Sequence, residues 1–434
     1  MFQTLRKKMF WSVDSLRGGK LKEHYEDIKF IMDNTMSNEA QLRIASKLKN
    51  ILEHASNTTS FYQHYKNMKL EEFPLINKNT IRPSYDDFIS SKFKHKKNYA
   101  AYTSGSTGTP FKLLHDKNKR LRNSADVIYF AQQAGFEIGH KLYYIRHWDQ
   151  YNSSHPLVSR MKNIHTHPVS KLSHDDVKKL LEHMAEDSST KGIMCYASVL
   201  DEIAKYVNST DDAPVISNIE SIIAISESLK DEVKLTLEKY FGIPIISRYS
   251  NVENGIFAQR FKNRSEFQIN WASYHVEILK LENNAPVEKG ELGRIVITDL
   301  YNYCMPMIRY DTGDLGSIGY ITKNGKKHKV LERIEGRKLD MIYDTSGKMI
   351  SPFTVYHILK YPHIIQYQFI QEHKINYKIK LNVAPQFNSA KEISKEFLEY
   401  LGKDAKIELE YVEDIPLLSS GKRKFVVNNY MKTR

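Results

Sequence analysis

The sequence predicts an α/β fold: a large N-terminal α/β domain with parallel sheets and a β-rich subdomain, then a small C-terminal α+β domain. Three observations support this. Short apolar runs alternate with helical segments between residues 142 and 250, as buried parallel strands do. Residues 274–330 alternate apolar and polar positions between tight turns. Residues 339–434 mix strands and helices over the length of a small domain.

The elements can be placed in chain order. Residues 1–72 are expected to form a helical lead-in, and FPLINKNTIR, from residue 73, enters a short helix that Asn77 is suited to cap. A helix over 228–242 should end at Gly242, where glycine accepts a left-handed backbone. The runs expected as strands are 142–147, 191–197, 220–227 and 243–250. A length of 434 residues suits two or three domains. We expect the large domain to cover 1–337 and the small one 338–434.

The net charge of +13 (64 Lys and Arg against 51 Asp and Glu) favours polyanionic partners but does not bear on the fold. Nucleic acid, an anionic membrane and a nucleotide phosphate chain all satisfy it. Two cysteines, with no CxxC pair, exclude a disulfide framework and a cysteine zinc site. Neither an apolar leader nor a spanning segment is evident, so we expect a cytoplasmic protein. Residues 2–10 are basic and amphipathic, which allows a peripheral membrane contact or ordinary packing on the domain.

The strongest local motif is YTSGSTGTP (102–110), which is dominated by glycine and by hydroxyl-bearing residues. Glycine lets a ligand approach the backbone closely, while hydroxyls and exposed amides can surround phosphate oxygens. The segment is not a Walker A loop, because Pro110 stands where the second glycine would be required. It therefore predicts either a phosphate-binding loop or a Ser/Gly loop without a ligand.

Two further segments lie at expected strand ends, where open α/β sheets place ligand-binding groups. In SRYSNVEN (247–254), Tyr249 offers a ring for stacking and Glu253 a hard oxygen for Mg²⁺. In MPMIRYDTGDL (305–315), two carboxylates flank a glycine turn, and one carboxylate can accept both ribose hydroxyls. A self-capped turn explains the second segment equally well.

The last two segments are RIEGRKLD (333–340), at the expected domain junction, and PLLSSGKRK (416–424), in a basic tail. A lysine on a glycine-containing turn can reach a phosphate as a point charge. Taken alone, such a tail is usually a solvated end.

All five segments occur in the order and approximate spacing of the adenylate-forming superfamily, which comprises acyl-CoA synthetases, adenylation domains and luciferases. The sequence most resembles the phenylacetate-CoA ligase and CapK-like branch, over roughly residues 73 to 425. The resemblance implies a mobile C-terminal domain, ATP and Mg²⁺ as cofactors, and an acyl-adenylate formed from a carboxylic acid with release of pyrophosphate. The acyl acceptor would be CoA, a carrier protein or an amino sugar, and the branch suggests capsule or surface-polysaccharide biosynthesis.

The resemblance also implies roles for individual residues. Lys422 would bridge the attacking carboxylate and the α-phosphate, and Glu253 would bind Mg²⁺. Tyr249 would lie against adenine, while Asp314, helped by Arg337, would hold the ribose. The remaining nucleotide contacts would come from Thr103, Ser104, Gly105, Ser106, Thr107, Gly108, Ser250 and Asn251.

Some positions depart from the family pattern. Ser250 and Val252 replace the Gly and Thr of the Tyr-Gly-x-Thr-Glu motif, so Asn251 would have to supply the α-phosphate contact. Leu339 stands where a hinge Asp is common, which puts the thioester-forming rotation in doubt but not adenylation. Arg309 is a further candidate for facing the ligands. For the acid pocket, strand ends nominate His147, Trp148, Ser226 and Glu227, although a packed aromatic pair explains the first two equally well.

The alternatives are a basic nucleic-acid-binding protein without catalysis and a degenerate adenylate-forming fold used only for binding. The basic runs lie far apart in the sequence, so we expect no nucleic-acid partner. A serine hydrolase and a zinc hydrolase are disfavoured because GxSxG and HExxH are absent.

Overall fold

The computed structural model describes residues 2–102, 111–146, 148, 156–170, 172–281, 283–323, 325–337, 342–350, 355, 358, 361–416 and 425–430. The chain divides into two compact units, Met1–Thr312 with Ser317–Arg333, and Gly313–Gly316 with Ile334–Arg434. Within the described ranges, no helix is both long and apolar enough to span a membrane.

The larger unit begins with helices, as expected for its lead-in. Ser37 accepts a hydrogen bond from the Ala40 amide (3.2 Å) and so caps the longest of them. Asn77 accepts from the amides of Asn79 (2.8 Å) and Thr80 (3.1 Å), which confirms the predicted cap of α4. The elements are α1 (Phe2–Leu16), α2 (Lys20–Asp33), α3 (Asn38–Thr58), α4 (Lys78–Ile81) and the 3-10 turns Gln63–Tyr65, Leu70–Glu72 and Arg82–Phe88.

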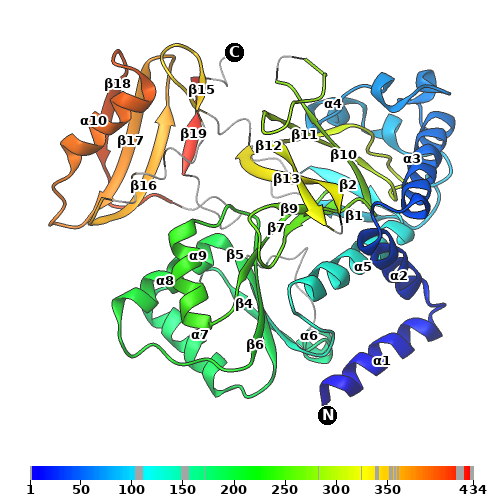
Figure 1. Cartoon of the computed structure of the whole chain (residues 1–434), viewed down its shortest axis with the longest axis horizontal. Coiled ribbons are helices and arrows are strands. Elements are labelled where there is room, and N and C mark those ends of the chain that lie inside the picture. The colour runs from blue at the N-terminus through cyan, green and yellow to red at the C-terminus, as the bar shows by residue number, and fades with distance from the viewer. Residues whose placement is uncertain are drawn as a thin grey trace. The chain divides into compact units, whose positions relative to one another are not determined.

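The four predicted strands form the parallel part of an eleven-stranded sheet, in the order β7-β6-β5-β3. A fifth parallel strand, β4, which the sequence did not predict, pairs with β3 at the edge. Helices α7, α8 and α9 pack against these strands through a core of isoleucine, leucine and valine (Figure 1). α9 ends at Gly242 (φ 72°), as predicted. The bounds are β3 (Lys141–Arg146), α6 (Pro156–Met161), β4 (Ile164–Pro168), α7 (His174–Glu186), β5 (Lys191–Tyr196), α8 (Ala197–Ser209), β6 (Ile219–Ile225), α9 (Asp231–Phe241) and β7 (Ile245–Asn251).

The β-rich part continues the same sheet instead of forming a separate one. β8 pairs antiparallel with β7 and with β9, and the order runs on through β13, β12, β11 and β10. A separate hairpin, β1 with β2, leads into α5. The bounds are β1 (Tyr99–Tyr102), β2 (Lys112–His115), α5 (Lys117–Gln133), β8 (Gly255–Arg260), β9 (Phe267–Ile269), β10 (Tyr274–Leu279), β11 (Leu292–Asp299), β12 (Tyr310–Lys323) and β13 (Lys326–Arg337).

The smaller unit is an α+β structure with its own core. Ile393, Phe397 and Leu401 recur every fourth residue along α10 and are fully buried. A four-stranded sheet, in the order β18-β17-β16-β19, supplies the other side of that core. The bounds are β14 (Ile342–Tyr343), β15 (Met349–Ile350), β16 (Ile364–Gln371), β17 (Asn376–Val383), α10 (Ala390–Leu401), β18 (Lys406–Tyr411) and β19 (Val426–Asn428).

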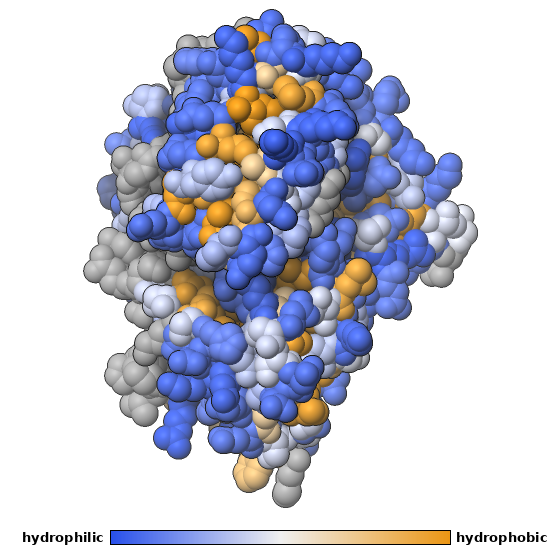
Figure 2. Space-filling view, turned by 90° about the vertical axis from the view of Figure 1, so that its left-hand side faces the viewer, coloured by the Kyte–Doolittle hydropathy of each residue, from blue (hydrophilic) through white to orange (hydrophobic). Residues whose placement is uncertain are grey.

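The face of the molecule shown in Figure 2 is mainly hydrophilic, and its hydrophobic residues occur in small groups. Exposed apolar residues in such small groups are normal for globular proteins and need no partner.

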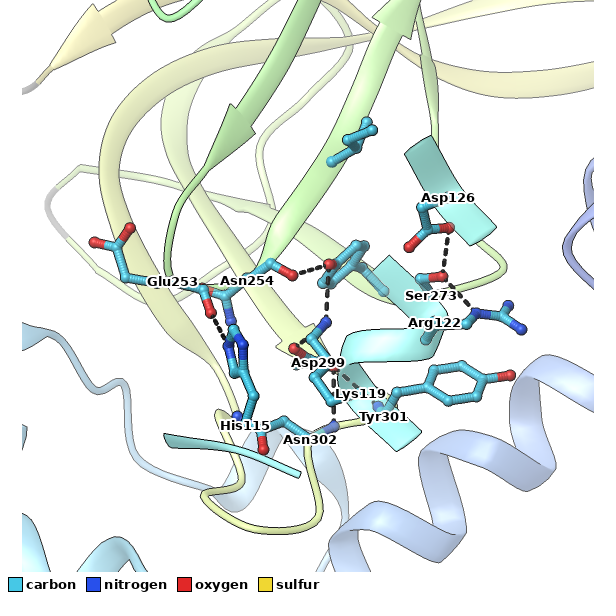
Figure 3. Close-up of polar contacts among 12 residues, drawn as sticks. His115, Lys119, Arg122, Asp126, Glu253, Asn254, Ser273, Asp299, Tyr301 and Asn302 are labelled. Atoms are coloured by element: carbon cyan, nitrogen blue, oxygen red, sulfur yellow. Dashed lines mark hydrogen bonds and ion pairs between the residues drawn. The ribbon is translucent and has the colours of Figure 1, made fainter. Parts of the chain in front are cut away.

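A buried polar cluster lies along one side of α5, where Lys119, Arg122 and Asp126 are spaced three and four residues apart. Lys119 Nζ lies 2.6 Å from Asp299 Oδ2 at the end of β11, and neither side chain has exposed surface. Lys119 Nζ also donates to the Tyr274 hydroxyl at 3.0 Å. Figure 3 shows these groups meeting between α5 and the sheet.

Arg122 extends the cluster to the lead-in helices. Its guanidinium donates to Asp27 Oδ2 of α2 (2.7 Å) and to Ser273 Oγ (2.8 Å). Ser273 Oγ donates in turn to Asp126 Oδ1 (2.9 Å), and Tyr301 also donates to Asp27 (3.0 Å). The cluster therefore ties α2, α5 and the strand ends together with paired charges.

We expect Lys119→Met to lower the free energy of unfolding by about 3–5 kcal/mol, because it leaves Asp299 buried without its cation. Lys117→Met, on the exposed side of the same helix, should change it by less than about 0.5 kcal/mol. Urea unfolding followed by circular dichroism measures both variants. Equal stabilities would mean that the buried pair contributes nothing.

Candidate active site

The candidate metal ligand Glu253 lies in a tight turn between β7 and β8. Asn251 Oδ1 accepts from the Asn254 amide (2.8 Å) and closes this turn. Gly255 follows with φ 119°, and a Cβ there would lie 2.8 Å from the Tyr274 hydroxyl, so glycine is required. Glu253 is 4% exposed, and its carboxylate forms an ion pair with Lys78 of α4.

Buried side chains form hydrogen bonds to the backbone carbonyls of this turn. His115 Nε2 lies 2.7 Å from the Glu253 carbonyl oxygen, and the Tyr274 hydroxyl donates to the Asn254 carbonyl (Figure 3). Burial lowers the pKa of His115, so the ring is neutral at pH 7. A carbonyl oxygen only accepts, which places the single ring proton on Nε2. Burial raises the pKa of Tyr274 well above 10, which keeps it a donor.

Tyr249 lies near the end of β7, inside the strand expected over 243–250. Its hydroxyl donates to Thr312 Oγ1 at 3.2 Å, and its ring lies 5.2 Å from the Phe257 ring. Thr312 belongs to the segment 305–315, so two of the predicted motifs meet here. Ser250, at a bulge in the pairing with β8, is half-buried.

The ribose candidate Asp314 is half-buried and lies inside β12, just after Gly313 (φ 80°). Arg309, expected to face the ligands, is wrongly assigned. It is 3% exposed, its guanidinium is 3.0 Å from Glu277 Oε1, and it donates to the Glu71 carbonyl at 2.8 Å. These bonds fasten the lead-in to β10, which is a structural role.

The acid-pocket candidates differ from one another. Trp148 donates from Nε1 to the His167 carbonyl (3.1 Å) and contacts Tyr144 edge-on. Glu227 Oε2 accepts from the Ser198 amide (2.9 Å) in the first turn of α8, a capping role that the sequence did not predict. Ser226 is exposed with φ 71°, a conformation that non-glycine residues rarely adopt outside functional or strained sites.

The other predicted site residues lie outside the described ranges. They are Thr103, Ser104, Gly105, Ser106, Thr107, Gly108, His147 and Lys422, together with the side chain of Arg337. Tyr102 and Lys112, which flank the first of these segments, are paired across β1 and β2.

Motif reasoning missed Lys78, His115 and Tyr274. Lys78 is the lysine of the PLINK lead-in, so its position was visible in the sequence but its partner Glu253 was not. His115 is the last residue of a short strand, and Tyr274 lies in an ordinary alternating run. No local signal distinguishes either of them from a packing residue.

Within the described ranges, no group of three His, Cys, Asp or Glu residues is placed to hold a metal ion. Mg²⁺ commonly binds through one or two carboxylates and substrate phosphates. The ion pair with Lys78 shows that the Glu253 carboxylate already stabilises a cation.

Comparison with known proteins finds relatives of this chain. Residues 342–429 match the family model of the CapK C-terminal domain. Protein CapK of Staphylococcus aureus is 24% identical over 439 residues, covering 94% of this chain and 93% of that protein. Phenylacetate-coenzyme A ligase of Thermus thermophilus is 23% identical over 164 residues, covering 37% of each.

Solved structures match the fold over most of the chain. A 2-hydroxyisobutyryl-CoA ligase in its postadenylation state gives a TM-score of 0.70 at 14% identity, covering 91% of this chain and 90% of that one. ATP-bound MatB from Rhodopseudomonas palustris gives 0.55 at 16% identity, covering 75% and 66%. The resemblance recognised from motif order is confirmed: the chain is similar to Protein CapK over most of its length and has the fold of the CoA-ligase structure.

Proposed function

We propose that the chain activates a carboxylic acid with ATP, forming an acyl-adenylate and pyrophosphate, and then transfers the acyl group to CoA. One observation carries the proposal: segments assigned to adenine and ribose, 247–254 and 305–315, are hydrogen-bonded to each other through Tyr249 and Thr312. The likeness to ligase structures holding an acyl-AMP, or acyl-AMP with CoA, supports it.

In this proposal, ATP binds along the ends of β7 and β12. The half-buried ring of Tyr249 lies against adenine, and Asp314, with Arg337, accepts the ribose hydroxyls. Hydroxyls and amides of residues 103–108, with Ser250 and Asn251, hold the phosphates. The hydrogen bond between Tyr249 and Thr312 holds the stacking ring next to the segment proposed to bind the ribose.

Glu253 is the proposed Mg²⁺ ligand, and Mg²⁺ would neutralise the phosphate oxygens when it is bound. The turn holds this carboxylate in place, since His115 and Tyr274 bind the carbonyls of Glu253 and Asn254. Rigid support of this kind matters because catalytic geometry must be held within fractions of an ångström. His115 and Tyr274 are thus positioning residues.

The reaction joins two anions, so positioning and positive charge lower the barrier most. A carboxylate oxygen forms a bond to the α-phosphorus, the bond to the bridging oxygen breaks, and pyrophosphate leaves with those electrons. Lys422 guides the carboxylate toward the α-phosphate. No general base is required, because a carboxylic acid is already ionised near pH 7.

The acceptor is proposed to be CoA, whose thiolate would displace AMP from the acyl-adenylate. A carrier-protein thiol or an amino sugar would react by the same displacement. A place in capsule or surface-polysaccharide biosynthesis, which the CapK-like resemblance of the motifs implies, is part of this proposal. ATP–pyrophosphate exchange over a panel of amino, hydroxy and aromatic acids identifies the acid, and product analysis with each acceptor identifies the transfer step.

Lys422→Ala should lower ATP–pyrophosphate exchange at least about 100-fold, the scale of losing one donor to the transition state. Lys424→Ala, in the same basic run, should exchange at nearly the rate of the unmodified protein. Undiminished exchange in Lys422→Ala would overturn the assignment.

Glu253→Gln keeps the size of the side chain but removes the charge that would bind Mg²⁺. We expect exchange to fall at least about 100-fold at fixed Mg²⁺, with half-saturation moved to a higher Mg²⁺ concentration. Glu232→Gln, on the exposed side of α9, is the control and should change neither quantity. An unchanged Mg²⁺ titration for Glu253→Gln would exclude Glu253 as the ligand.

His115→Leu leaves the buried Glu253 carbonyl without its donor, which costs about 1–3 kcal/mol. We expect exchange to fall about tenfold or more and the Mg²⁺ half-saturation concentration to rise. Glutamine can place an N–H near the position of Nε2, so His115→Gln should restore both. If His115→Leu and His115→Gln lose the same stability and show the same Mg²⁺ half-saturation concentration, the role of His115 is structural only.

A further inference from the structure

The first helix, α1, presents its apolar side away from the protein. Phe2, Leu5, Met9, Val13 and Leu16 are spaced three and four residues apart and are 44–88% exposed. At 100° per residue they fall within a narrow stripe along one side of the helix. With Phe10, α1 holds six of the eighteen exposed large hydrophobic residues found in the described ranges.

The opposite side of α1 holds it to the rest of its unit. Lys7 Nζ lies 2.7 Å from Glu137 Oε2, and the Trp11 ring is 5.5 Å from the ring of Tyr25 in α2. The backbone of Gln3 runs so close to Gly139 that a Cβ there would lie 2.5 Å from the Gln3 carbonyl oxygen. These contacts determine which side of α1 faces solvent, and the apolar stripe lies on that side.

This orientation is the reverse of the usual one. A surface helix normally buries its apolar stripe and exposes its polar side. In α1 the half-buried positions are Gln3, Lys7, Trp11 and Asp14, whereas no residue of the helix is fully buried. The buried apolar area that usually stabilises such a helix is therefore left for a partner to cover.

The charges beside the stripe indicate which partner suits it. Arg6 and Lys8 are exposed and flank the stripe on its two sides, and Arg17 follows the helix. Asp14, the helix's own carboxylate, accepts hydrogen bonds from the backbone amides of Leu21 and Lys22. An apolar stripe between cations is complementary to a lipid surface with anionic headgroups, where acyl chains meet the stripe and phosphates meet the basic residues.

We propose that α1 is a docking helix for an anionic lipid surface, lying in the plane of the bilayer with its apolar stripe among the acyl chains. A second copy of the chain suits this face less well, because it would bring the same basic flanks and the same net charge of +13 against it. The proposal is independent of the proposed catalysis, since it uses no residue assigned to ATP or the acid.

Vesicle flotation tests the proposal, with phosphatidylcholine vesicles compared with vesicles containing one-third phosphatidylglycerol. The full-length protein should bind the anionic vesicles at least tenfold more tightly, and binding should weaken as salt rises. Leu5→Glu should reduce binding at least tenfold. Leu42→Glu, which alters a similarly exposed leucine of α3, should leave it unchanged.

A second pair of measurements makes the outcome decisive. Arg6→Glu with Lys8→Glu should abolish the preference for anionic vesicles, while circular dichroism and ATP–pyrophosphate exchange stay as in the unmodified protein. Three outcomes would overturn the proposal: no binding to anionic vesicles, equal loss in Leu5→Glu and Leu42→Glu, or a dimer in solution that Leu5→Glu dissociates. The last would assign the stripe to contact between copies of the chain.

Discussion

The ion pair between Lys119 and Asp299 is the constraint on which the larger unit depends. A buried charge without a partner costs several kcal/mol, so α5 and the end of β11 can approach only in the one register that joins these two groups. The same ammonium donates to Tyr274, whose hydroxyl donates to the carbonyl of Asn254. A core charge is thereby connected through two hydrogen bonds to the turn that carries Glu253, and the packing of the domain and the geometry of the candidate active site are set together.

The helices at the start of the chain also contribute to the candidate active site. Arg122 binds Asp27 of α2, and Arg309 donates to carbonyls in the segment before α4. α4 then supplies Lys78 to the Glu253 carboxylate. A residue that precedes segment 102–110, Lys78, thus supplies the cation that pairs with the proposed metal ligand Glu253. Removing the lead-in would therefore take Asp27 away from the buried Arg122 guanidinium.

The architecture was predictable because it rests on local patterns. Apolar runs such as 191–197 favour buried strands, and Asn77 and Gly242 mark helix ends by their own chemistry. The motifs were predictable because they keep their order along the chain. What pattern reading missed depends on pairing between distant segments: Arg309 pairs with Glu277 thirty-two residues away, and His115 with a carbonyl 138 residues away. The hydrogen bond from the Ser198 amide to Glu227 likewise has no signature in the sequence.

The surplus of positive charge can now be divided according to what surrounds each group. Lys119, Arg122 and Arg309 are buried against carboxylates, so they contribute to folding and present little charge to a partner. Nucleic acid, which the net charge alone allowed, would require an exposed basic surface interleaved with aromatic rings. The exposed cations of α1 instead flank aliphatic and Phe side chains, an arrangement suited to acyl chains and headgroup phosphates. Burial and neighbouring chemistry, more than the net value of +13, therefore decide which polyanion each part of the charge serves.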